Sequence, residues 1–158
     1  MKGNKISDEY EEIERFDKGY APVRNGEKKG LINTSGKLVV PLLYNLIFMQ
    51  YTDIAEVGIT RPSDQLDQVG LINLKNSQMF VPPIYEFISL GEDNIALVKT
   101  HDGKTGYINF SGKIIFQPRK LELANGFSDG LAEIKDEKGT FFIDKSGKQV
   151  QDRYHGQQ

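Results

Sequence analysis

Hydrophobic and polar positions alternate along much of the chain, in short runs that glycine, asparagine and proline interrupt. In the run from Tyr20 to Arg24, for example, Ala21 and Val23 fall on one side of an extended backbone and the other three residues on the opposite side. No run of twelve or more residues carries a helical stripe of apolar positions. The pattern predicts short strands joined by tight turns. Hairpin signals stand at Asn25-Gly26, Ser35-Gly36, Asp102-Gly103, Ser111-Gly112, Asn125-Gly126 and Ser146-Gly147.

Three short patterns recur four times along the chain, in the same order and with the same uneven spacing. The first is Tyr-x-x-apolar, which begins at Tyr10, Tyr44 and Tyr85 and, in a weaker copy, at Lys120. The second surrounds an alanine, at Ala21, Ala55, Ala96 and Ala132. The third surrounds an isoleucine, at Ile32, Ile72, Ile108 and Ile143. Self-similarity of this kind predicts a repeat protein, with units at approximately residues 10–43, 44–84, 85–119 and 120–150.

A tight turn is predicted four residues after each isoleucine of the third pattern. Glycine or asparagine, the residues that best tolerate a left-handed backbone, occupies that position: Gly36, Asn76, Gly112 and Gly147. An apolar run follows and ends near a proline in three units, where we expect the proline to close the strand: Pro41, Pro82 and Pro118. The pattern therefore predicts that each unit is a three-stranded antiparallel meander.

The second unit is longer than the others by about six residues. The additional residues lie around 60–68, and their proline, serine and aspartate are typical of an exposed loop.

Neighbouring units have to cover one another, because a single meander of short strands cannot bury its own apolar face. We expect the four isoleucines and the four alanines to form the shared core. The predicted fold class is all-β, with about four tandem repeats stacked into one body, either an open array or a small propeller-like or barrel-like one. Residues 1–150 are predicted to be a single domain, and residues 151–158 a flexible tail.

Composition narrows the possible classes of function. The 158 residues include 20 basic and 22 acidic side chains, so the net charge of −2 gives no support for a nucleic-acid surface or an anionic-membrane surface. No apolar run is long enough to span a bilayer, and the N-terminal residues turn acidic where a signal peptide is apolar. We therefore expect a cytoplasmic protein, or a mature form from which a signal has been removed.

No arrangement of residues predicts catalysis. The chain lacks cysteine and has two histidines, which leaves no thiol nucleophile and no multi-histidine metal site. His101 and Asp102 are adjacent, so in a strand they point to opposite faces. Gly103-Lys104-Thr105 resembles the end of a phosphate loop, but Val98 stands where that loop needs a glycine. We predict no enzyme activity, no cofactor and no metal.

The repeats resemble those of the WG-repeat family of bacterial proteins. The resemblance rests on Phe16–Val23 with Gly30–Lys37, and on Phe127–Ile134 with Phe142–Lys148, and it covers roughly residues 10–150. The family's Trp-Gly pair is only half present, because its tryptophan position is occupied by Lys29, Val69, Thr105 and Thr140. The resemblance implies a β-rich repeat scaffold without catalytic residues, in a family that includes stand-alone binding or immunity factors.

Two surface features are candidates for binding a partner. The first is an acidic stretch that includes Asp8, Glu9, Glu11 and Glu12, which is either a surface for a basic partner or a solvated edge strand whose charges block aggregation. The second is the inserted loop, which is either a binding loop or a neutral length variation. Its candidate residues are Arg61, as the anchor, with Asp64, Gln65 and Asp67.

These features predict a non-catalytic repeat protein that binds another protein. The most specific hypothesis is an immunity-type inhibitor, a monomer on its own, that neutralises a bacterial toxin by steric occlusion. The alternative is a carbohydrate-binding or cell-envelope-binding module, which needs exposed aromatic platforms; the chain has no tryptophan for this and seven tyrosines. Tyr51 would add contact area to the inserted loop if it were exposed, and its position suits the core equally. A third possibility is an array that oligomerises through an uncapped end, although the charged first unit and the polar last residues favour capped ends.

Overall fold

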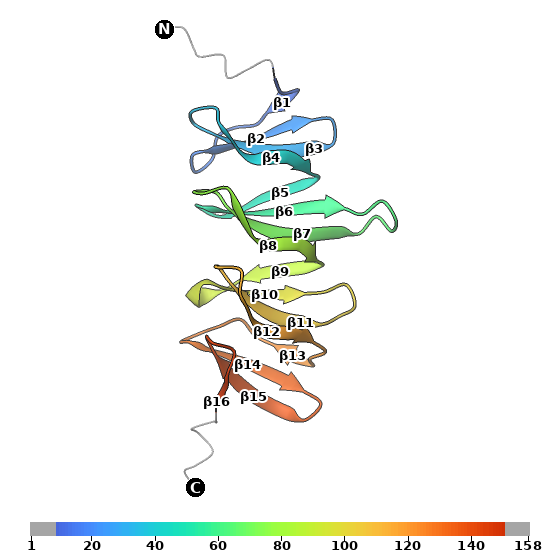
Figure 1. Cartoon of the computed structure of the whole chain (residues 1–158), viewed down its shortest axis with the longest axis vertical. Helices are drawn as coiled ribbons and strands as arrows, with labels where there is room; N and C mark the ends of the chain where they lie inside the picture. Colours follow the sequence, from blue (N-terminus) through green and yellow to red (C-terminus); the bar gives the residue numbers. More distant parts are fainter. Residues whose placement is uncertain (1–8, 151–158) are drawn as a thin grey trace. The chain divides into compact units, whose positions relative to one another are not determined.

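The computed structural model describes residues 9–150, which form sixteen β-strands and one short 3-10 helix. The strands make four antiparallel sheets, each with its strands in chain order (Figure 1). This confirms the prediction of an all-β chain built from four antiparallel repeats. Asp8 and the predicted tail at residues 151–158 lie outside the described residues.

The chain divides into two compact units, Met1–Pro83 and Ile84–Gln158. The first sheet contains β1 (Glu12–Ile13), β2 (Tyr20–Asn25), β3 (Lys28–Asn33) and β4 (Leu38–Tyr44). The second sheet contains β5 (Leu46–Tyr51), β6 (Ile54–Thr60), β7 (Asp67–Asn73) and β8 (Gln78–Tyr85), whose last two residues pass the division.

The second unit holds the other two sheets. The third sheet contains β9 (Phe87–Leu90), β10 (Ile95–Lys99), β11 (Thr105–Asn109) and β12 (Ile114–Arg119), with the 3-10 helix η1 (Glu92–Asn94) between β9 and β10. The fourth sheet contains β13 (Leu123–Ala124), β14 (Leu131–Asp136), β15 (Gly139–Asp144) and β16 (Gln149–Val150).

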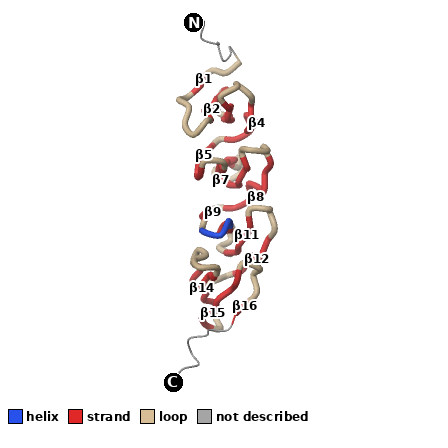
Figure 2. The backbone as a smooth tube through the Cα atoms, turned by 90° about the vertical axis from the view of Figure 1, so that its left-hand side faces the viewer, coloured by secondary structure: helices blue, strands red, loops and turns tan. Residues whose placement is uncertain are grey.

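Each sheet has one strand more than the predicted meander. The last strand of the first sheet and the first strand of the second are separated by Asn45 alone, and Glu86 alone separates β8 from β9. One apolar run in the sequence therefore supplies edge strands to two successive sheets. Every sheet is open, and Figure 2 shows β5 and β8 at opposite margins of theirs.

The core of the first unit lies between its two sheets. Ala55 and Val57 of β6 are fully buried there against side chains of β3 and β4, of which Leu31 and Val40 are also fully buried. The outer face of the first sheet, with Ala21, Val23 and Ile32, is covered by Tyr10, Phe16 and Leu42. Burial of one such aliphatic side chain contributes about 1.5–3 kcal/mol, so the stacked faces account for much of the stability.

The core of the second unit is built in the same way, with aromatic side chains added. Tyr107 of β11 is fully buried against Ala132, Ile134 and Ile143 of the fourth sheet. Its ring meets that of Phe127 edge to face, with the ring centres 5.4 Å apart. Its hydroxyl donates a hydrogen bond of 2.6 Å to the carbonyl of Asn125. All four repeat alanines and all four repeat isoleucines are buried, as predicted.

The tight turns after the third pattern are confirmed in three repeats. Gly36, Gly112 and Gly147 have positive φ angles of 80°, 85° and 81°. In the second repeat the left-handed residue is Ser77, with φ of 58°, rather than the predicted Asn76. The turn is one residue longer there, and this places Leu74 in the core of the first unit.

An acceptor side chain organises these turns. Asn109 Oδ1 accepts hydrogen bonds from the Ser111 backbone N–H, the Ser111 hydroxyl and the Lys113 backbone N–H, at 3.1, 2.6 and 3.0 Å. Asn33 and Asp144 make the same three contacts. Local hydrogen bonding of this kind explains why Asn or Asp stands at this position.

Two expectations about strand ends are wrong. Pro41, Pro82 and Pro118 do not close their strands but lie inside β4, β8 and β12. Proline is tolerated there because all three are edge strands, in which an N–H on the outer side has no ladder partner to lose. Asn125-Gly126 is not a hairpin turn, since Asn125 continues the pairing with a hydrogen bond to Glu133, and the chain turns at Asp129-Gly130 instead.

The glycine that opens the third pattern is required by a close approach of the backbone. A Cβ atom on Gly30, Gly70 or Gly106 would lie 2.5–2.6 Å from a carbonyl oxygen of the facing last strand. In the first and third sheets the register of this strand pair shifts at that point. The contact therefore fixes glycine in three repeats by sterics and not by backbone conformation.

The Gly106→Ala substitution tests this contact. The new methyl group would meet Phe116 O at 2.6 Å and Pro118 N at 2.8 Å, so we expect a loss of about 1–3 kcal/mol in the free energy of unfolding, as for other overpacked sites. Gly126→Ala is the matched control in the same unit, because nothing lies within 4 Å of its Cβ position. Its effect should stay within about 0.5 kcal/mol. Urea unfolding of both variants measures the difference, and equal stabilities would contradict the explanation.

The buried hydroxyl of Tyr107 makes a second prediction. Burial raises the pKa of Tyr107 from 10.0 to about 12. Between these values the unfolded chain releases this proton and the folded chain keeps it, so the free energy of unfolding falls as pH rises. The Tyr107→Phe variant should lose this contribution to the pH dependence above pH 10. At neutral pH it should lose about 1 kcal/mol for the missing hydrogen bond. Urea unfolding at neutral pH and above pH 10 measures both, and an unchanged slope would contradict the assignment.

Candidate functional site

Strand β5 forms one edge of the second sheet and lacks the charges and prolines that commonly protect an edge strand. Its six residues, Leu46–Tyr51, include no charge and no proline, and within the described chain β5 pairs only with β6. The corresponding first strands of the other sheets are shorter, with two residues in β1, four in β9 and two in β13. A long, uncharged edge strand is the kind that native proteins normally protect.

A bulge places two aromatic side chains of β5 on the same face of the sheet. Phe48 lies opposite Glu56 and Tyr51 opposite Ile54, with a register shift between Met49 and Tyr51. Glu56 and Ile54 are two residues apart on β6, so they share a face, and their partners on β5 share it as well. Phe48 is 55% exposed and Tyr51 48% exposed. Tyr51, which the sequence left open as core or surface, is therefore a surface residue.

Glu56 is the carboxylate beside this aromatic pair. It is half-buried, and the side-chain amide of Gln50 donates a hydrogen bond of 3.0 Å to its Oε2. Burial raises the pKa of Glu56 above its ordinary value, although the hydrogen bond from Gln50 lowers it. The carboxylate thus remains incompletely compensated within the sheet.

Three of the four first strands carry an ion pair at their start, and β5 does not. The pairs are Glu11–Arg24 at 3.4 Å, Glu86–Lys99 at 3.9 Å and Glu122–Lys135 at 2.8 Å. In each, the backbone N–H of the glutamate also donates to the carbonyl of its cationic partner. In the second repeat Asn45 and Gly58 occupy these positions and make the backbone hydrogen bond, of 2.8 Å, without an ion pair. The side-chain oxygen of Asn45 accepts hydrogen bonds from Lys28 Nζ at 3.2 Å and from the Thr60 N–H at 3.1 Å.

The acidic residues predicted to bind a partner belong to this pattern in the first repeat. Glu11 and Glu12 both reach the guanidinium of Arg24, at 3.4 and 2.9 Å, and Glu11 also accepts the backbone N–H of Gly26. The carbonyl of Glu9 accepts the side-chain amide of Asn25. β1 is a solvated edge strand whose two residues are exposed. These carboxylates are thus partly neutralised within the chain.

The inserted loop, residues 61–66 between β6 and β7, is closed upon itself. The guanidinium of Arg61 binds both carboxylate oxygens of Asp64, through Nε at 3.1 Å and through Nη2. The Arg61 N–H donates to Leu66 O at 2.9 Å, and the Gln65 N–H donates back to Arg61 O at 2.9 Å. Asp67 accepts the Thr60 hydroxyl at 2.6 Å. The predicted loop residues thus lie together, with the charges of Arg61 and Asp64 paired to each other.

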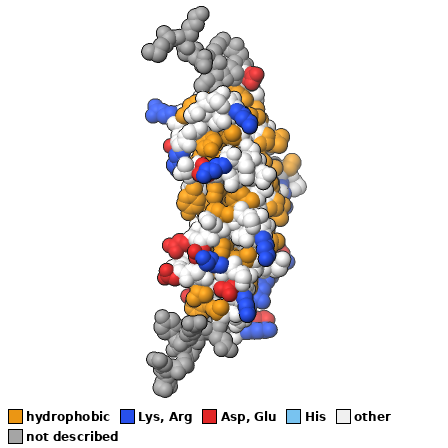
Figure 3. All heavy atoms as spheres, turned by 60° about the vertical axis from the view of Figure 1, so that its left-hand side comes forward, with side chains coloured by type: hydrophobic (Ala, Val, Ile, Leu, Met, Phe, Trp, Pro, Cys, Tyr) orange, Lys and Arg blue, Asp and Glu red, His pale blue; other side chains and the backbone are white. Residues whose placement is uncertain are grey.

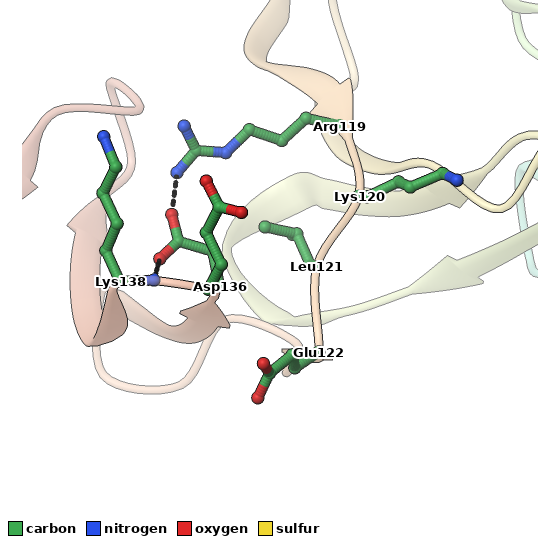
Figure 4. Close-up of a pocket in the computed structure, with 7 residues that line it drawn as sticks. Arg119, Lys120, Leu121, Glu122, Asp136 and Lys138 are labelled. Atoms are coloured by element: carbon green, nitrogen blue, oxygen red, sulfur yellow. Dashed lines mark hydrogen bonds and ion pairs between the residues drawn. The ribbon is translucent and has the colours of Figure 1, made fainter.

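Two hollows lie within the second unit. The one in Figure 4 has a volume of about 380 Å³ and is crossed by the ion pair of Arg119 and Asp136, at 2.9 Å. The guanidinium also lies 4.9 Å from the ring centre of Phe116 and 5.5 Å from that of Phe141, so Arg119 has a structural role in packing these two rings. The other hollow, of about 510 Å³, is lined by apolar residues that include Phe87, Leu97 and Leu123.

A polar groove of about 650 Å³ lies in the first unit. It is lined by residues of the turns after β3 and β7, which include Lys37, Leu38, Leu74 and Lys75. Lys75 is paired with Asp53 at 3.2 Å.

The described residues contain no group of three or more His, Cys, Asp or Glu side chains that would hold a metal ion. Within the same residues, no helix is long and apolar enough to cross a membrane. Asp102 accepts hydrogen bonds from Thr100 and pairs with Lys104, while the half-buried His101 has no hydrogen-bond partner at Nε2 in this part of the chain. His101 is therefore half-buried and not fully exposed to solvent.

Reasoning from the sequence missed the edge of β5. The available signal was the run Leu46–Tyr51, six residues without charge, glycine or proline, in the one repeat where asparagine replaces glutamate at the strand start.

The Glu56→Gln substitution tests whether the half-buried carboxylate of Glu56 destabilises the fold at neutral pH. Because burial raises the folded-state pKa of Glu56, the unfolded chain loses the proton first as pH rises, and the carboxylate destabilises the fold at neutral pH. We expect Glu56→Gln to unfold at a higher temperature than the wild type at pH 7. Below about pH 4.5 the two proteins should unfold together, because Glu56 is then protonated in both states. Thermal unfolding at both pH values measures this, and a difference independent of pH would argue against it.

Comparison with known proteins agrees with the repeat architecture. The family model described as "WG containing repeat" matches residues 1–28, 30–54 and 106–139, which together make up more than half of the chain. No curated protein matches the chain significantly. The matched residues include the Phe16–Val23 and Phe127–Ile134 segments and the glycines Gly30 and Gly106. The chain is a member of the WG-containing-repeat family.

Proposed function

We propose that this repeat protein binds another protein and has no catalytic activity of its own. The observation that carries the proposal is the exposed edge of β5, with Phe48 and Tyr51 on one face. Aromatic side chains supply much of the binding energy in protein interfaces. A surface of this kind occurs in one repeat, where the neighbouring hairpin also carries the inserted loop.

The charged residues predicted from the sequence have a supporting role in this proposal. Arg61 pairs with Asp64 within the loop, and Glu11 and Glu12 pair with Arg24, whereas Asp67 accepts the Thr60 hydroxyl. Charges already paired on a rim affect the association rate and the choice of partner more than the affinity. Figure 3 shows acidic and basic side chains interspersed with hydrophobic ones on one face of the molecule.

We further propose that the protein is a cytoplasmic inhibitor of the immunity type, which neutralises a bacterial toxin by covering it. The support is a repeat scaffold that presents an apolar edge and partly exposed aromatic residues, with charged groups around them. Occlusion requires surface complementarity and no chemistry from the chain. Co-expression with a toxin encoded beside its gene should restore growth of a sensitive host.

A carbohydrate-binding module is the second candidate, and the same aromatic pair favours it. Phe48 and Tyr51 offer two exposed rings on one face, and Tyr51 adds a hydroxyl for hydrogen bonding. A glycan array without hits would remove this candidate.

The Phe48→Asp substitution tests the binding surface. The chain is used to capture proteins from its native host, and we expect a specific protein that Phe48→Asp retains at least tenfold less, about 1.4 kcal/mol of binding energy. Leu43→Asp is the matched control, because Leu43 lies on β4 of the same unit and is 59% exposed. Leu43→Asp should retain the protein as the wild type does. If neither the wild-type chain nor Leu43→Asp captures a specific protein, the proposed function is wrong.

A further inference from the structure

We propose that β5 binds its partner by strand addition, so that an extended segment of the partner pairs with the outer edge of β5 as a fifth strand of the second sheet. This inference rests on the proposed protein-binding function and specifies how the partner is recognised. The geometry of β5, its lack of protecting residues and the charge on its face each support it.

The backbone of β5 leaves a row of hydrogen-bonding groups without a strand partner. In the described chain its pairing is with β6 alone, through Leu46↔Gly58, Ile47↔Val57, Phe48↔Glu56 and Met49↔Ala55. In an antiparallel pair, alternate residues direct their N–H and C=O groups away from the partner strand. Another extended backbone satisfies such a row at the right spacing, and many domains bind peptides in this way.

Among the eight edge strands of the described residues, β5 is the one longer than four residues that carries neither a charge nor a proline, and its bulge lies at its end, beyond the regular pairing of Leu46–Met49. The far edges of the first three sheets carry proline, at Pro41, Pro82 and Pro118, and β16 has two residues. The near edges β1, β9 and β13 are shorter and each begins beside a glutamate ion pair. These features disfavour strand addition at the other seven edges and make β5 the edge most open to it.

The shape of β5 fits a partner strand on one face in particular. Ile47 and Met49 pack inward against the core of the first unit, which holds the strand in place. Phe48 and Tyr51 face outward, so an added strand would lay apolar side chains beside both rings.

The charge on this face indicates what the partner segment contains. Glu56, opposite Phe48, is a half-buried carboxylate with no cation to pair with among its cross-strand neighbours, which are Phe48 and Leu71. A lysine or arginine of the partner would compensate it. A second copy of this chain would add its own β5, which carries no cation, so the occupant is a different protein with a basic, strand-forming segment.

The test uses a display library of random twelve-residue peptides, selected against the full chain at neutral pH. We expect the selected peptides to be rich in β-branched and aromatic residues and to carry a lysine or arginine. In amide NMR spectra of the full chain, the bound peptides should shift the signals of residues 46–51. Glu56→Gln should weaken their binding several-fold.

N-methylation of the peptide then separates strand addition from other binding. A methyl group on alternate backbone nitrogens should reduce affinity at least tenfold, and on the intervening nitrogens it should have little effect, because only one set faces β5. The Phe48→Lys variant should lose the peptide, whereas Ser89→Lys, at the corresponding exposed position of β9, should keep it.

Several outcomes would overturn the inference. They are a selection without binding peptides, binding that shifts residues other than β5, a uniform effect of N-methylation, and a dimer of the chain alone that Phe48→Lys disperses. Capture of a specific host protein in these cases would leave the proposed function standing, and only the strand-addition mode would be wrong.

Discussion

The structure depends on the close stacking of one sheet face upon the next within each unit. A four-stranded sheet with strands of two to eight residues cannot bury enough apolar surface alone, so each repeat is stable only where a neighbour covers it. Within each unit the alanine of the second sheet, Ala55 or Ala132, lies in this contact and is fully buried. Its small side chain lets the facing sheet approach, and the aliphatic residues around it fill the remaining space.

A second close approach, between the third and fourth strands of the first three sheets, follows from the first. The fourth strand of each of these sheets packs side chains into the core and carries a proline. One of its carbonyl oxygens lies so close to the glycine of the third strand that a Cβ atom would not fit there. Phe141 occupies the corresponding position of the fourth sheet, where the residues that would face it lie outside the described chain. Its ring instead joins Phe116 and Arg119. The family's glycine is therefore kept for packing reasons even where its tryptophan is lost.

The repeats are alike in their core and differ at their edges, and the proposed binding surface lies where they differ. Glutamate ion pairs guard the first strand of three sheets, and asparagine replaces glutamate in the second sheet. The same repeat has the longest first strand, the inserted loop and a carboxylate whose pKa is raised by burial. Such changes cost stability, since unprotected edges and half-buried charges both do. Their concentration in one repeat is the reason for assigning the binding surface to it.

The repeat pattern, the all-β class, the buried alanines and isoleucines and three of the four left-handed turns could be predicted from the sequence. These features depend on alternation and on glycine or asparagine at fixed positions, which act locally. Three-dimensional packing decided the rest. The left-handed residue of the second repeat is Ser77 and not Asn76, because the turn is one residue longer there, with Leu74 in the core. The prolines are compatible with strands because those strands lie at edges. Tyr51 lies at the surface because a bulge changes the alternation of side chains along β5. Its cross-strand partner, Ile54, shows that it shares a face of the sheet with Phe48. Which sheet edge stays unpaired depends on contacts between residues that are distant in the sequence. Such contacts cannot be read from one sequence alone.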